Sequence, residues 1–591
     1  MALSRSDQSI LQNLIYQQKH LLFSVGIFSA FVNLLMLTGP LFMLQLYDRV
    51  LASRSESTLV ALVGIATFLF LVMGLLDHAR ARVLARVGQR VQMDMFPRAV
   101  RSLVKLSLHT GRRSEAIASQ KDLEKMQQFL SGPSMYVFFD LPWTPVFIAI
   151  LFIFHWLLGV QAILSALLIV VLVIINQLRT RKLGEESTKK TGVLHQFLSQ
   201  VLHGAETVQG LGMNDTVNQR VVDLNADTAS KKIVALDRGG AYSVSSRTLR
   251  LYLQSMMLGT GAWLAIRDEV TAGTMIAATI MLGRALAPVD LAIAQWPVLQ
   301  SARKAQQNLN ALFEETMRND PPLTLPPPIA SLEARDLTVV PPGGTEASVN
   351  NVSFALEPGK VFGLVGPPGS GKSTLARALV GIWPAASGSV MLGGVEHSQY
   401  DSDSLGRYIG WLPQEVFLFD GTVADNISRL ETQLAFESEN SSDVSDATDY
   451  QMQAGAEPSS LIESRILEAS RLAGVHEMIL SLPDGYNFRI GNNGSMLSGG
   501  QRQRIVLARA FYRNALIYIL DEPDAHLDDY AIEQLTLTIS TLSSQGRSFL
   551  IISNRRGTLK VCDQIFVMKN SRFSGTYDLA ADKLVELSKS H

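Results

Sequence analysis

The sequence has little cysteine and little net charge. Its 591 residues include one cysteine, Cys562, and the formal net charge at pH 7 is −1. A single cysteine excludes an intrachain disulfide and any metal site built from several cysteines. A chain with almost no net charge gives no reason to expect a nucleic acid as its partner.

Charged residues are also scarce. They make up 18% of the sequence, whereas hydrophobic residues make up 47%, a high share for a soluble protein. The chain is too long for one domain, since a domain takes roughly 150 residues. A cleaved signal peptide is not expected, because the first apolar run, from Leu21, is longer than the apolar core of such a peptide and has no small-residue cleavage site.

Apolar runs in the first half of the chain predict membrane-spanning helices. A helix needs about 20 mainly apolar residues to cross the hydrocarbon core of a bilayer. The alternative, buried core helices of a soluble protein, does not explain so many long runs. The six runs are Leu21–Leu46, Leu59–Leu76, Tyr136–His155, Leu157–Asn176, Leu251–Ile266 and Gly273–Asp290.

The loops between these runs differ in charge. Two long stretches, 77–135 and 177–250, are rich in arginine and lysine, whereas the loops near 47–57 and 267–272 are short and balanced. The positive-inside rule therefore places the N-terminus and both long stretches in the cytoplasm. Their helix-forming composition indicates that the membrane helices continue beyond the bilayer. For most of these basic residues, a solvated helix face that only sets the topology is a sufficient explanation.

A proline-rich segment marks a domain boundary. Glu314–Pro328 reads EETMRNDPPLTLPPP, and prolines favour extended backbone without hydrogen-bond donors. We therefore predict an α-helical six-span membrane domain over 1–312, a linker over 313–330 and a second domain over 331–591.

The second domain carries a phosphate-binding loop. The segment Val361–Thr374, VFGLVGPPGSGKST, has the P-loop spacing between an apolar strand and a helical pattern, which makes a chance glycine loop a poor alternative. Backbone N–H groups and the helix N-terminus can bind phosphate, Lys372 can reach the β- and γ-phosphates, and the Ser373 hydroxyl can ligate Mg²⁺. The predicted ATP-binding residues are Gly366, Pro367, Pro368, Gly369, Ser370, Gly371, Lys372, Ser373 and Thr374.

Two further segments complete a predicted α/β nucleotide-binding domain. The apolar strand Leu516–Leu520 ends in Asp521 and Glu522, where one acid can hold Mg²⁺ and the other can polarise the attacking water. Leu497–Gln501, LSGGQ, opens a helix and forms a second anion-binding helix N-terminus. Because the P-loop already binds one phosphate group, this second site suits the phosphate of another subunit.

With these motifs in place, the chain resembles an ABC exporter half-transporter, which works as a dimer. Five segments are similar to the type I protein secretion exporters, and to the branch that serves RTX proteases and lipases. They are YDRVL (47–51), FFDLPWTPVF (138–147), HGAETVQGLGMN (203–214), GVHEMILSLPDGY (474–486) and LSGGQRQRIVLARAFY (497–512). The short segment before the first span leaves no room for the N-terminal peptidase-like domain of other branches.

The resemblance implies roles for individual residues. Gln414 is similar to the Q-loop glutamine, a Mg²⁺ ligand with Ser373 and Asp521 that links the γ-phosphate to the membrane domain. Glu522 resembles the catalytic base and Asp528 the D-loop aspartate. Turns near 112–120 and 204–214 resemble coupling helices. The residues implied to contact the partner's ATP are Ser498, Gly499, Gly500 and Gln501.

The sequence departs from the family pattern at three places. Where the family has a switch histidine after a strand, here Phe549–Ile552, the chain has Asn554, which forms neutral hydrogen bonds only. ATP binding should survive and hydrolysis should be slowed. The adenine-stacking aromatic is replaced by Val340 and Pro341. An acidic, serine-rich insertion at about 431–460 reads as a disordered loop, with a regulatory or docking segment as the alternative.

The implied function is an ATP-driven exporter of a type I secretion system in the bacterial inner membrane, with a cytoplasmic nucleotide-binding domain. The implied cofactors are ATP and Mg²⁺. The implied partners are a second copy of the chain, membrane lipid, a periplasmic adaptor, an outer-membrane channel and an unfolded secreted protein with a C-terminal signal. Three alternatives remain: a degenerate subunit of a heterodimeric exporter, a nucleotide-gated membrane regulator with little ATPase activity, and a lipid or drug exporter.

Overall fold

The chain forms two compact units. The computed structural model describes residues 16–110, 113–316, 325–433, 459–578 and 583–586. One unit comprises Met1–Ser107 with Arg112–Arg318, and the other comprises Leu108–Gly111 with Asn319–His591. Most of the predicted insertion, and the middle of the predicted linker, lie outside the described residues.

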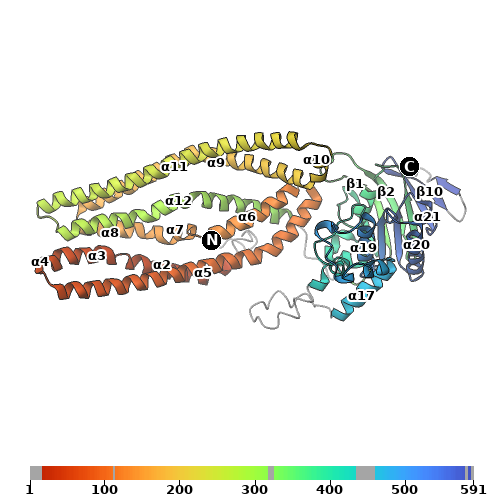
Figure 1. Cartoon of the computed structure of the whole chain (residues 1–591), viewed down its shortest axis with the longest axis horizontal. Coiled ribbons are helices and arrows are strands. Elements are labelled where there is room, and N and C mark those ends of the chain that lie inside the picture. The colour runs from red at the N-terminus through yellow and green to blue at the C-terminus, as the bar shows by residue number, and fades with distance from the viewer. Residues whose placement is uncertain (1–15, 111–112, 317–324, 434–458, 579–582, 587–591) are drawn as a thin grey trace. The chain divides into compact units, whose positions relative to one another are not determined.

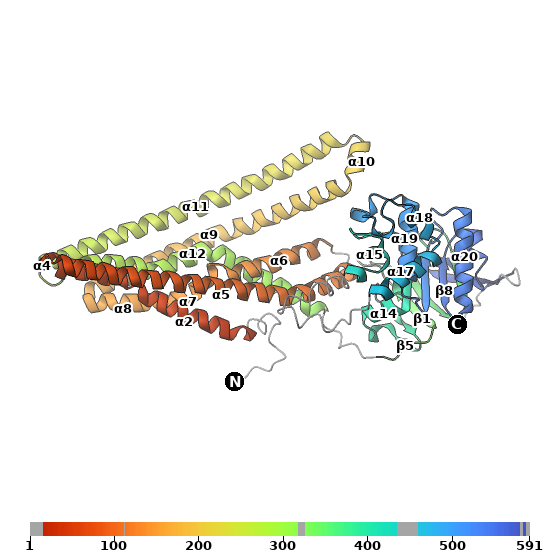
Figure 2. The ribbon, with the colours of Figure 1, turned by 60° about the horizontal axis from the view of Figure 1, so that its bottom comes forward.

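The described residues of the first unit form helices joined by short turns (Figure 1). Its long helices are α5, α9, α11 and α12, and α9 and α11 run side by side in both views (Figure 2). The elements are α2 (Lys19–Leu35), α3 (Thr38–Gln45), the π-helix η1 (Leu46–Val50), α4 (Leu51–Ser53), α5 (Glu56–Thr110), α6 (Arg113–Ser131), α7 (Ser134–Asp140), the 3-10 helix η2 (Leu141–Trp143), α8 (Thr144–Phe154), α9 (Trp156–His203), α10 (Ala205–Gly210), α11 (Asn214–Ile266) and α12 (Ala272–Thr316).

Four described segments of helix are long and apolar enough to cross a membrane. They are Lys19–Ser53, Glu56–Leu108, Gln120–Phe154 and Ala272–Glu314, and Trp156–Leu172 is a shorter apolar helix. The predicted runs Leu157–Asn176 and Leu251–Ile266 lie in α9 and α11, so six spans remain a prediction. Helix α5 alone has 55 residues. At 1.5 Å per residue it is about 80 Å long, more than twice the thickness of a hydrocarbon core.

One apolar cluster joins α8, α9, α11 and α12 of the first unit. Leu151 of α8, Leu158 of α9, Met257 of α11 and Leu282 of α12 are fully buried in one cluster. Many large apolar side chains elsewhere in the first unit are exposed, for example Leu75 of α5 at 70% and Ile153 of α8 at 80%. Such an outer surface suits contact with lipid.

The second unit is an α/β structure with two sheets, of order β2-β1-β4-β5 and β11-β10-β9-β3-β8-β7-β6. The strands are β1 (Leu332–Val339), β2 (Val349–Leu356), β3 (Val361–Val365), β4 (Ser387–Leu392), β5 (Val395–Glu396), β6 (Ile409–Leu412), β7 (Ile517–Asp521), β8 (Ser548–Ile552), β9 (Gln564–Lys569), β10 (Arg572–Asp578) and β11 (Lys583–Glu586). The helices are α13 (Lys372–Leu379), η3 (His397–Gln399), α14 (Ser402–Tyr408), α15 (Val423–Ile427), α17 (Ser459–Leu472), α18 (His476–Leu480), η5 (Gly485–Asn487), η6 (Asn492–Gly494), α19 (Gly499–Phe511), α20 (Asp529–Ser544) and α21 (Arg556–Leu559).

The central strands β3, β8, β7 and β6 are parallel neighbours. Alternate residues of β7 pack on opposite faces of the sheet. Tyr518 and Leu520 join one apolar cluster, whereas Ile517 and Ile519 join the other. Burial on both faces explains why these strands read as unbroken apolar runs in the sequence. The predicted fold class, a helical membrane unit followed by an α/β nucleotide-binding unit, is therefore confirmed.

Candidate nucleotide-binding site

The candidate site lies where four neighbouring strands end. The P-loop follows β3, Asn554 follows β8, Asp521 closes β7 and is followed by Glu522, and Gln414 follows β6. The carboxyl ends of parallel strands share one edge of a sheet, so these segments meet although they lie far apart in the sequence. The carboxyl ends of the strands of a parallel sheet are the usual place for a phosphate ligand in an α/β fold.

The P-loop has the backbone that a phosphate cradle requires. Gly371, the N-cap of α13, has φ = 102°, in the region that disfavours other residues. A Cβ atom at Gly371 would lie 2.0 Å from the carbonyl oxygen of Ser348. The Lys372 Nζ donates to the carbonyls of Gly366 and Pro367 at 2.8 and 3.0 Å. The lysine therefore lies over the loop, within reach of a phosphate that the loop would bind.

A chain of polar side chains crosses the sheet edge. Ser373 Oγ donates to Gln414 Oε1 at 3.4 Å, and Gln414 Nε2 donates to Glu522 Oε2 at 3.4 Å. These contacts bring together the predicted Mg²⁺ ligand of the P-loop, the predicted Q-loop residue and the predicted catalytic base. Both bonds are long, so these side chains have room to exchange partners when a ligand binds.

The residues present fit a magnesium ion and a phosphate. Asp521 is 2% exposed, and its Oδ1 has no hydrogen-bond partner among the described residues. Burial raises the pKa of the Asp521 carboxyl, and the Ser373 hydroxyl acts in the opposite direction. The buried Oγ of Ser370 in the P-loop is likewise without a described partner. A carboxylate, a hydroxyl and an amide oxygen form a donor set that Mg²⁺ accepts.

The LSGGQ segment forms the start of α19. Ser498 is the N-cap, and it forms a capping box in which Gln501 N donates to Ser498 Oγ at 3.3 Å and Ser498 N donates to Gln501 Oε1 at 2.8 Å. Gly499 and Gly500 follow in the first turn, so their N–H groups lie at the positive end of the helix dipole. Asp528 is the N-cap of α20, where its Oδ1 accepts from Ala531 N at 2.8 Å.

Asn554 lies two residues beyond the end of β8 and is exposed. Its neighbour Ser553 is buried and donates to Asp524, which also accepts from Thr558 Oγ1 at 2.6 Å. Arg555 Nη1 donates to the Leu527 carbonyl at 3.1 Å. The segment that presents Asn554 is therefore held firmly to the residues before Asp528, while the amide of Asn554 itself faces solvent.

Two residues that the sequence did not single out join this site to α19. Gln503 is buried and donates from Nε2 to the Glu522 carbonyl at 2.8 Å. Its Oε1 lies 3.0 Å from His526 Nδ1. Because the Glu522 carbonyl only accepts, Gln503 must present its oxygen to His526, so Nδ1 carries the proton. Glu522 and His526 both have positive φ, 51° and 60°, and Gln503 holds this strained turn. The position of Gln503, two residues after LSGGQ, was the feature of the sequence that could have pointed to its role.

The base-stacking departure is visible in the structure as well. Val340 follows the end of β1, and Val340 and Pro341 are part-buried rather than free to cover a large ring. Neither residue has the flat face that stacks on a purine.

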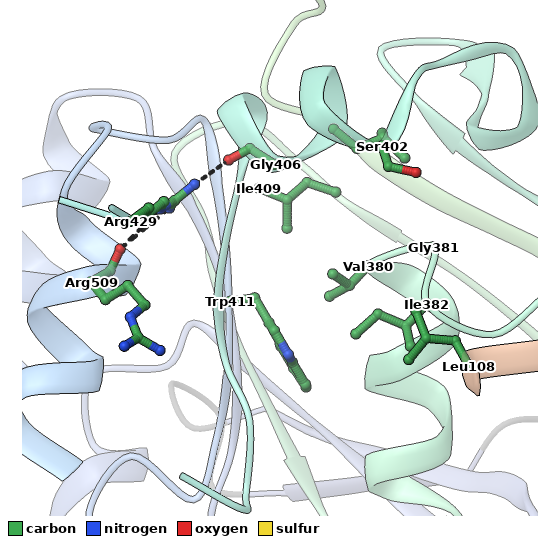
Figure 3. A pocket seen from close by; sticks show the side chains of 11 residues that line it. Leu108, Val380, Gly381, Ile382, Ser402, Gly406, Ile409, Trp411, Arg429 and Arg509 are labelled. Carbon is green, nitrogen blue, oxygen red and sulfur yellow. Dashed lines mark hydrogen bonds between the residues drawn. The ribbon is translucent and has the colours of Figure 1, made fainter. Parts of the chain in front are cut away.

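A separate pocket of about 360 Å³ lies elsewhere in the second unit, beside β6 (Figure 3). Trp411, Val380 and Ile382 give it an apolar wall. Arg429 and Arg509 also line it. Burial lowers the pKa of each to about 10, and both remain charged at neutral pH. Arg429 already donates to the carbonyls of Gly406 and Arg509. None of the predicted site residues lines this pocket, so it is not part of the nucleotide site.

Comparison with known families identifies both units. The model of the family described as ABC transporter matches residues 349–525. The model described as ABC transporter transmembrane region matches residues 22–286. The first match includes the P-loop, LSGGQ and the end of β7, and it stops before Asn554.

Curated relatives match over most of the chain. The chain is 36% identical over 548 residues to the type I secretion system ATP-binding protein PrsD of Rhizobium meliloti (strain 1021), which covers 93% of this chain and 90% of the relative. It is 27% identical to the alpha-hemolysin translocation ATP-binding protein HlyB of Escherichia coli O157:H7, covering 97% of this chain and 78% of the relative. It is 29% identical to the cyclolysin secretion/processing ATP-binding protein CyaB of Bordetella pertussis (strain Tohama I), covering 96% and 76%.

A solved structure supports the fold. The chain superimposes on a bacterial Atm1-family ABC exporter with ATP bound, with a TM-score of 0.74, 19% sequence identity and coverage of 95% of each chain. At this identity the likeness concerns the fold alone.

Proposed function

This chain belongs to the ABC transporter family, as an ATP-driven exporter of the type I secretion class in the inner membrane, and we propose that it exports an unfolded protein as a homodimer. Its multi-pass membrane unit and its transport-coupled ATPase unit follow from the family matches. The observation that carries the export proposal is the 36% identity to a type I secretion ATP-binding protein over 93% of the chain.

The proposed chemistry is hydrolysis of ATP at the sheet edge. Bound Mg²⁺ would neutralise charge on the β- and γ-phosphates, and Ser373, Gln414 and Asp521 are the residues to hold it. The P-loop backbone and Lys372 bind and orient the phosphates. Glu522 accepts the proton of the attacking water, and the Gln503 bond to its backbone keeps it at the turn. These residue roles are proposals that rest on the motif positions and on the contacts above.

The proposed dimer completes each ATP site with a second chain. The helix N-terminus at Ser498–Gly500 offers anion-binding N–H groups in addition to the P-loop. A second chain in head-to-tail orientation would place this helix end on the γ-phosphate of ATP bound at the first chain's P-loop. Closure of the dimer on two ATP molecules is then the step that drives the membrane helices.

The proposed cargo is a secreted protein of the RTX protease or lipase kind, read by a C-terminal signal. It would pass through a periplasmic adaptor and an outer-membrane channel. The names of two relatives refer to alpha-hemolysin translocation and cyclolysin secretion, which supports a protein cargo over a lipid or a drug. The cytoplasmic location of the nucleotide-binding unit follows from the charge distribution of the loops.

One observation favours a second candidate function. Asn554 occupies the switch position and cannot carry a proton. A chain with slow hydrolysis at its own P-loop and an intact LSGGQ segment suits one subunit of a heterodimer, or a nucleotide-gated regulator. Glu522 is retained, which favours the homodimeric exporter.

The export proposal is tested by deleting the gene in its own organism. The proteins of the culture medium are compared by mass spectrometry between the wild type, the deletion strain and a strain complemented with Glu522→Gln. We expect one or a few proteins to disappear on deletion and to stay absent in the Glu522→Gln strain. Unchanged medium proteins, with changed membrane lipid or drug tolerance, would favour a lipid or drug exporter instead.

A further inference from the structure

A buried ion pair joins three helices of the membrane unit. Arg80 of α5 is 4% exposed and donates from Nη1 to Asp140 Oδ1 of α7 at 2.8 Å and to Ser29 Oγ of α2 at 3.0 Å. Asn33 of α2 donates from Nδ2 to the same Asp140 oxygen at 2.8 Å. One guanidinium therefore fastens α2 and α7 to α5.

Further groups surround the guanidinium. Its Nη2 lies 2.8 Å from Asp77 Oδ1, one turn earlier on α5, and its centre lies 4.2 Å from the ring centroid of Tyr136 on α7. The Nε has no partner among the described residues. This is a site in which most, but not all, of the arginine's donors are used.

Burying the Arg80–Asp140 ion pair costs free energy of hydration, so a contribution to folding stability does not by itself explain why the pair is there. A buried ion pair is often no better for stability than apolar residues of the same volume, because both charges lose their hydration. Arg80 lies 24 residues after the first residue of α5, about 36 Å along the helix. This places it just beyond the inner edge of a hydrocarbon core about 30 Å thick, at the start of the predicted cytoplasmic stretch 77–135.

Both partner helices are interrupted next to the pair. Asp140 is the last residue of α7, and η2 with Pro142 follows before α8 begins. Asn33 lies two residues before the end of α2, and α3 begins three residues after that end. Breaks of this kind, where a short turn or 3-10 segment replaces the α-helix, often mark a hinge. Helix α5, in contrast, continues as one helix from Arg80 for 30 residues to Thr110, with Pro97 inside it, about 45 Å.

We propose that Arg80 is a positioning residue for export, which transmits movement of the far half of α5 to the breaks in α2 and α7. The residue acts through Asp140 and Asn33 and touches no nucleotide. The proposal rests on the export function above, since it assigns a coupling role within that function. It requires the charge pair itself, so that replacing either charge uncouples ATP hydrolysis from movement of the two partner helices.

The first test compares export with ATP hydrolysis in the full-length chain. Arg80→Gln and Asp140→Asn each remove one charge. Asp140→Asn keeps the size of the side chain, whereas Arg80→Gln shortens it. We expect each to lower export at least about tenfold while ATP turnover of the purified chain stays within about twofold of wild type. The exchanged pair Arg80→Asp with Asp140→Arg should recover export at least about threefold over either single variant.

Matched controls separate coupling from folding. Lys190 and Asp227 form an exposed ion pair at 2.6 Å between α9 and α11, so Lys190→Gln should leave export unchanged. Immunoblots of the membrane fraction normalise export to the amount of chain. Export that stays at the wild-type level in Arg80→Gln and Asp140→Asn would overturn the proposal. A parallel fall of ATP turnover and export, with no recovery in the exchanged pair, would also overturn it in favour of a structural role.

The second test does not depend on a cargo. Hydrogen–deuterium exchange is measured on the purified chain in nanodiscs, without nucleotide and with ATP held by Glu522→Gln. We expect the exchange of α2 and α7 peptides to change with ATP when Arg80 is present and to stay constant in Arg80→Gln. Equal changes in both would overturn the proposal. A deletion strain with unchanged medium would contradict the export function alone, and this exchange measurement would still decide the role of Arg80.

Discussion

Gly371 is the residue on which the P-loop backbone depends most closely. Its φ of 102° disfavours any side chain, and a Cβ atom would press on the Ser348 carbonyl at 2.0 Å. Gly369 also has positive φ, 76°, but nothing lies within 4 Å of its Cβ position. A side chain at Gly369 would meet only an unfavourable backbone conformation, whereas a side chain at Gly371 would also collide with a neighbouring carbonyl.

We predict that Gly371→Ala weakens ATP binding at least about tenfold, because a shift of about 1–3 kcal/mol is typical of such strain. Gly369→Ala should weaken binding less, since it carries the conformational cost without the collision. Binding is measured by fluorescence of a labelled ATP analogue on the purified chain. Equal losses in the two variants would show that the contact with Ser348 has no part in the effect.

Asp521 illustrates the conflict between stability and function at one residue. Burial raises the pKa of its carboxyl above its ordinary value of 3.8, so the folded state holds the proton more tightly than the unfolded state does. Stability is then lost as pH rises through the raised pKa, and a bound cation would offset the free-energy cost of ionising the buried carboxyl.

We therefore predict that Asp521→Asn melts at a higher temperature than wild type at neutral pH without nucleotide. The difference should shrink as the pH falls toward 3.8. Addition of Mg²⁺ and ATP should raise the melting temperature of wild type and raise that of the variant much less. A variant that melts lower than wild type at neutral pH would contradict the assigned effect of burial.

At the scale of elements, α19 connects two functions through one hydrogen-bonded path. Its first turn carries the capping box of Ser498 and Gln501, and its second turn carries Gln503, which bonds to Glu522 and His526. Through the bonds of Gln503, a displacement of the LSGGQ end of α19 would move the turn that holds the predicted catalytic base.

This path gives a prediction with a conservative control. His526→Ala removes the hydrogen bond to Gln503, and its loss should lower the turnover of ATP about fivefold, since such a bond contributes about 1 kcal/mol and 1.4 kcal/mol is tenfold in rate. His526→Asn retains an N–H donor near the Nδ1 position and should stay within about threefold of wild type. Turnover of both variants is measured with saturating Mg²⁺ and ATP. If His526→Asn is as slow as His526→Ala, the imidazole has a role beyond this bond.

The elements differ in how far the sequence predicts them. The P-loop and the end of β7 are local patterns, so the strand before Gly366 and the acids after Leu520 could be read directly. The apolar runs predicted helices for the same reason. The neighbours of each strand, by contrast, depend on the sheet order, which brings Gln414 to Glu522 across 108 positions.

Contacts between charged residues that lie far apart in the sequence could not be predicted from it, because these contacts depend on how the helices pack. Arg80 read as one of many basic residues that set topology, and its burial depends on Asp140, 60 positions away. Asp48 in YDRVL accepts from Gly273 N at 2.9 Å across 225 positions, which fixes the start of α12. Both acids lie in segments noted for resemblance, but the partner of neither could be chosen without the packed helices.

At the scale of the whole molecule, the proposed dimer has a direct genetic test. Lys372→Ala should disable a chain's P-loop, and Ser498→Arg should disable its LSGGQ end. Each variant alone should be inactive. A dimer of one chain of each kind keeps one complete site, so co-expression should restore up to about a quarter of wild-type ATP turnover. A mixture as inactive as its components would indicate that each site is complete within one chain.

The central claim is that this chain is an ATPase that drives export, despite asparagine at position 554. The most direct measurement is the hydrolysis of Mg²⁺-ATP by the purified chain alone in nanodiscs, with Glu522→Gln as the blank and Asn554→His as the comparison. The account predicts turnover above the blank, and a faster rate in Asn554→His by about a hundredfold, the low end of what a protonatable group can add. Turnover at the blank level in both chains would contradict the account. Turnover at the blank level that Asn554→His restores would instead point to a partner subunit with its own competent site.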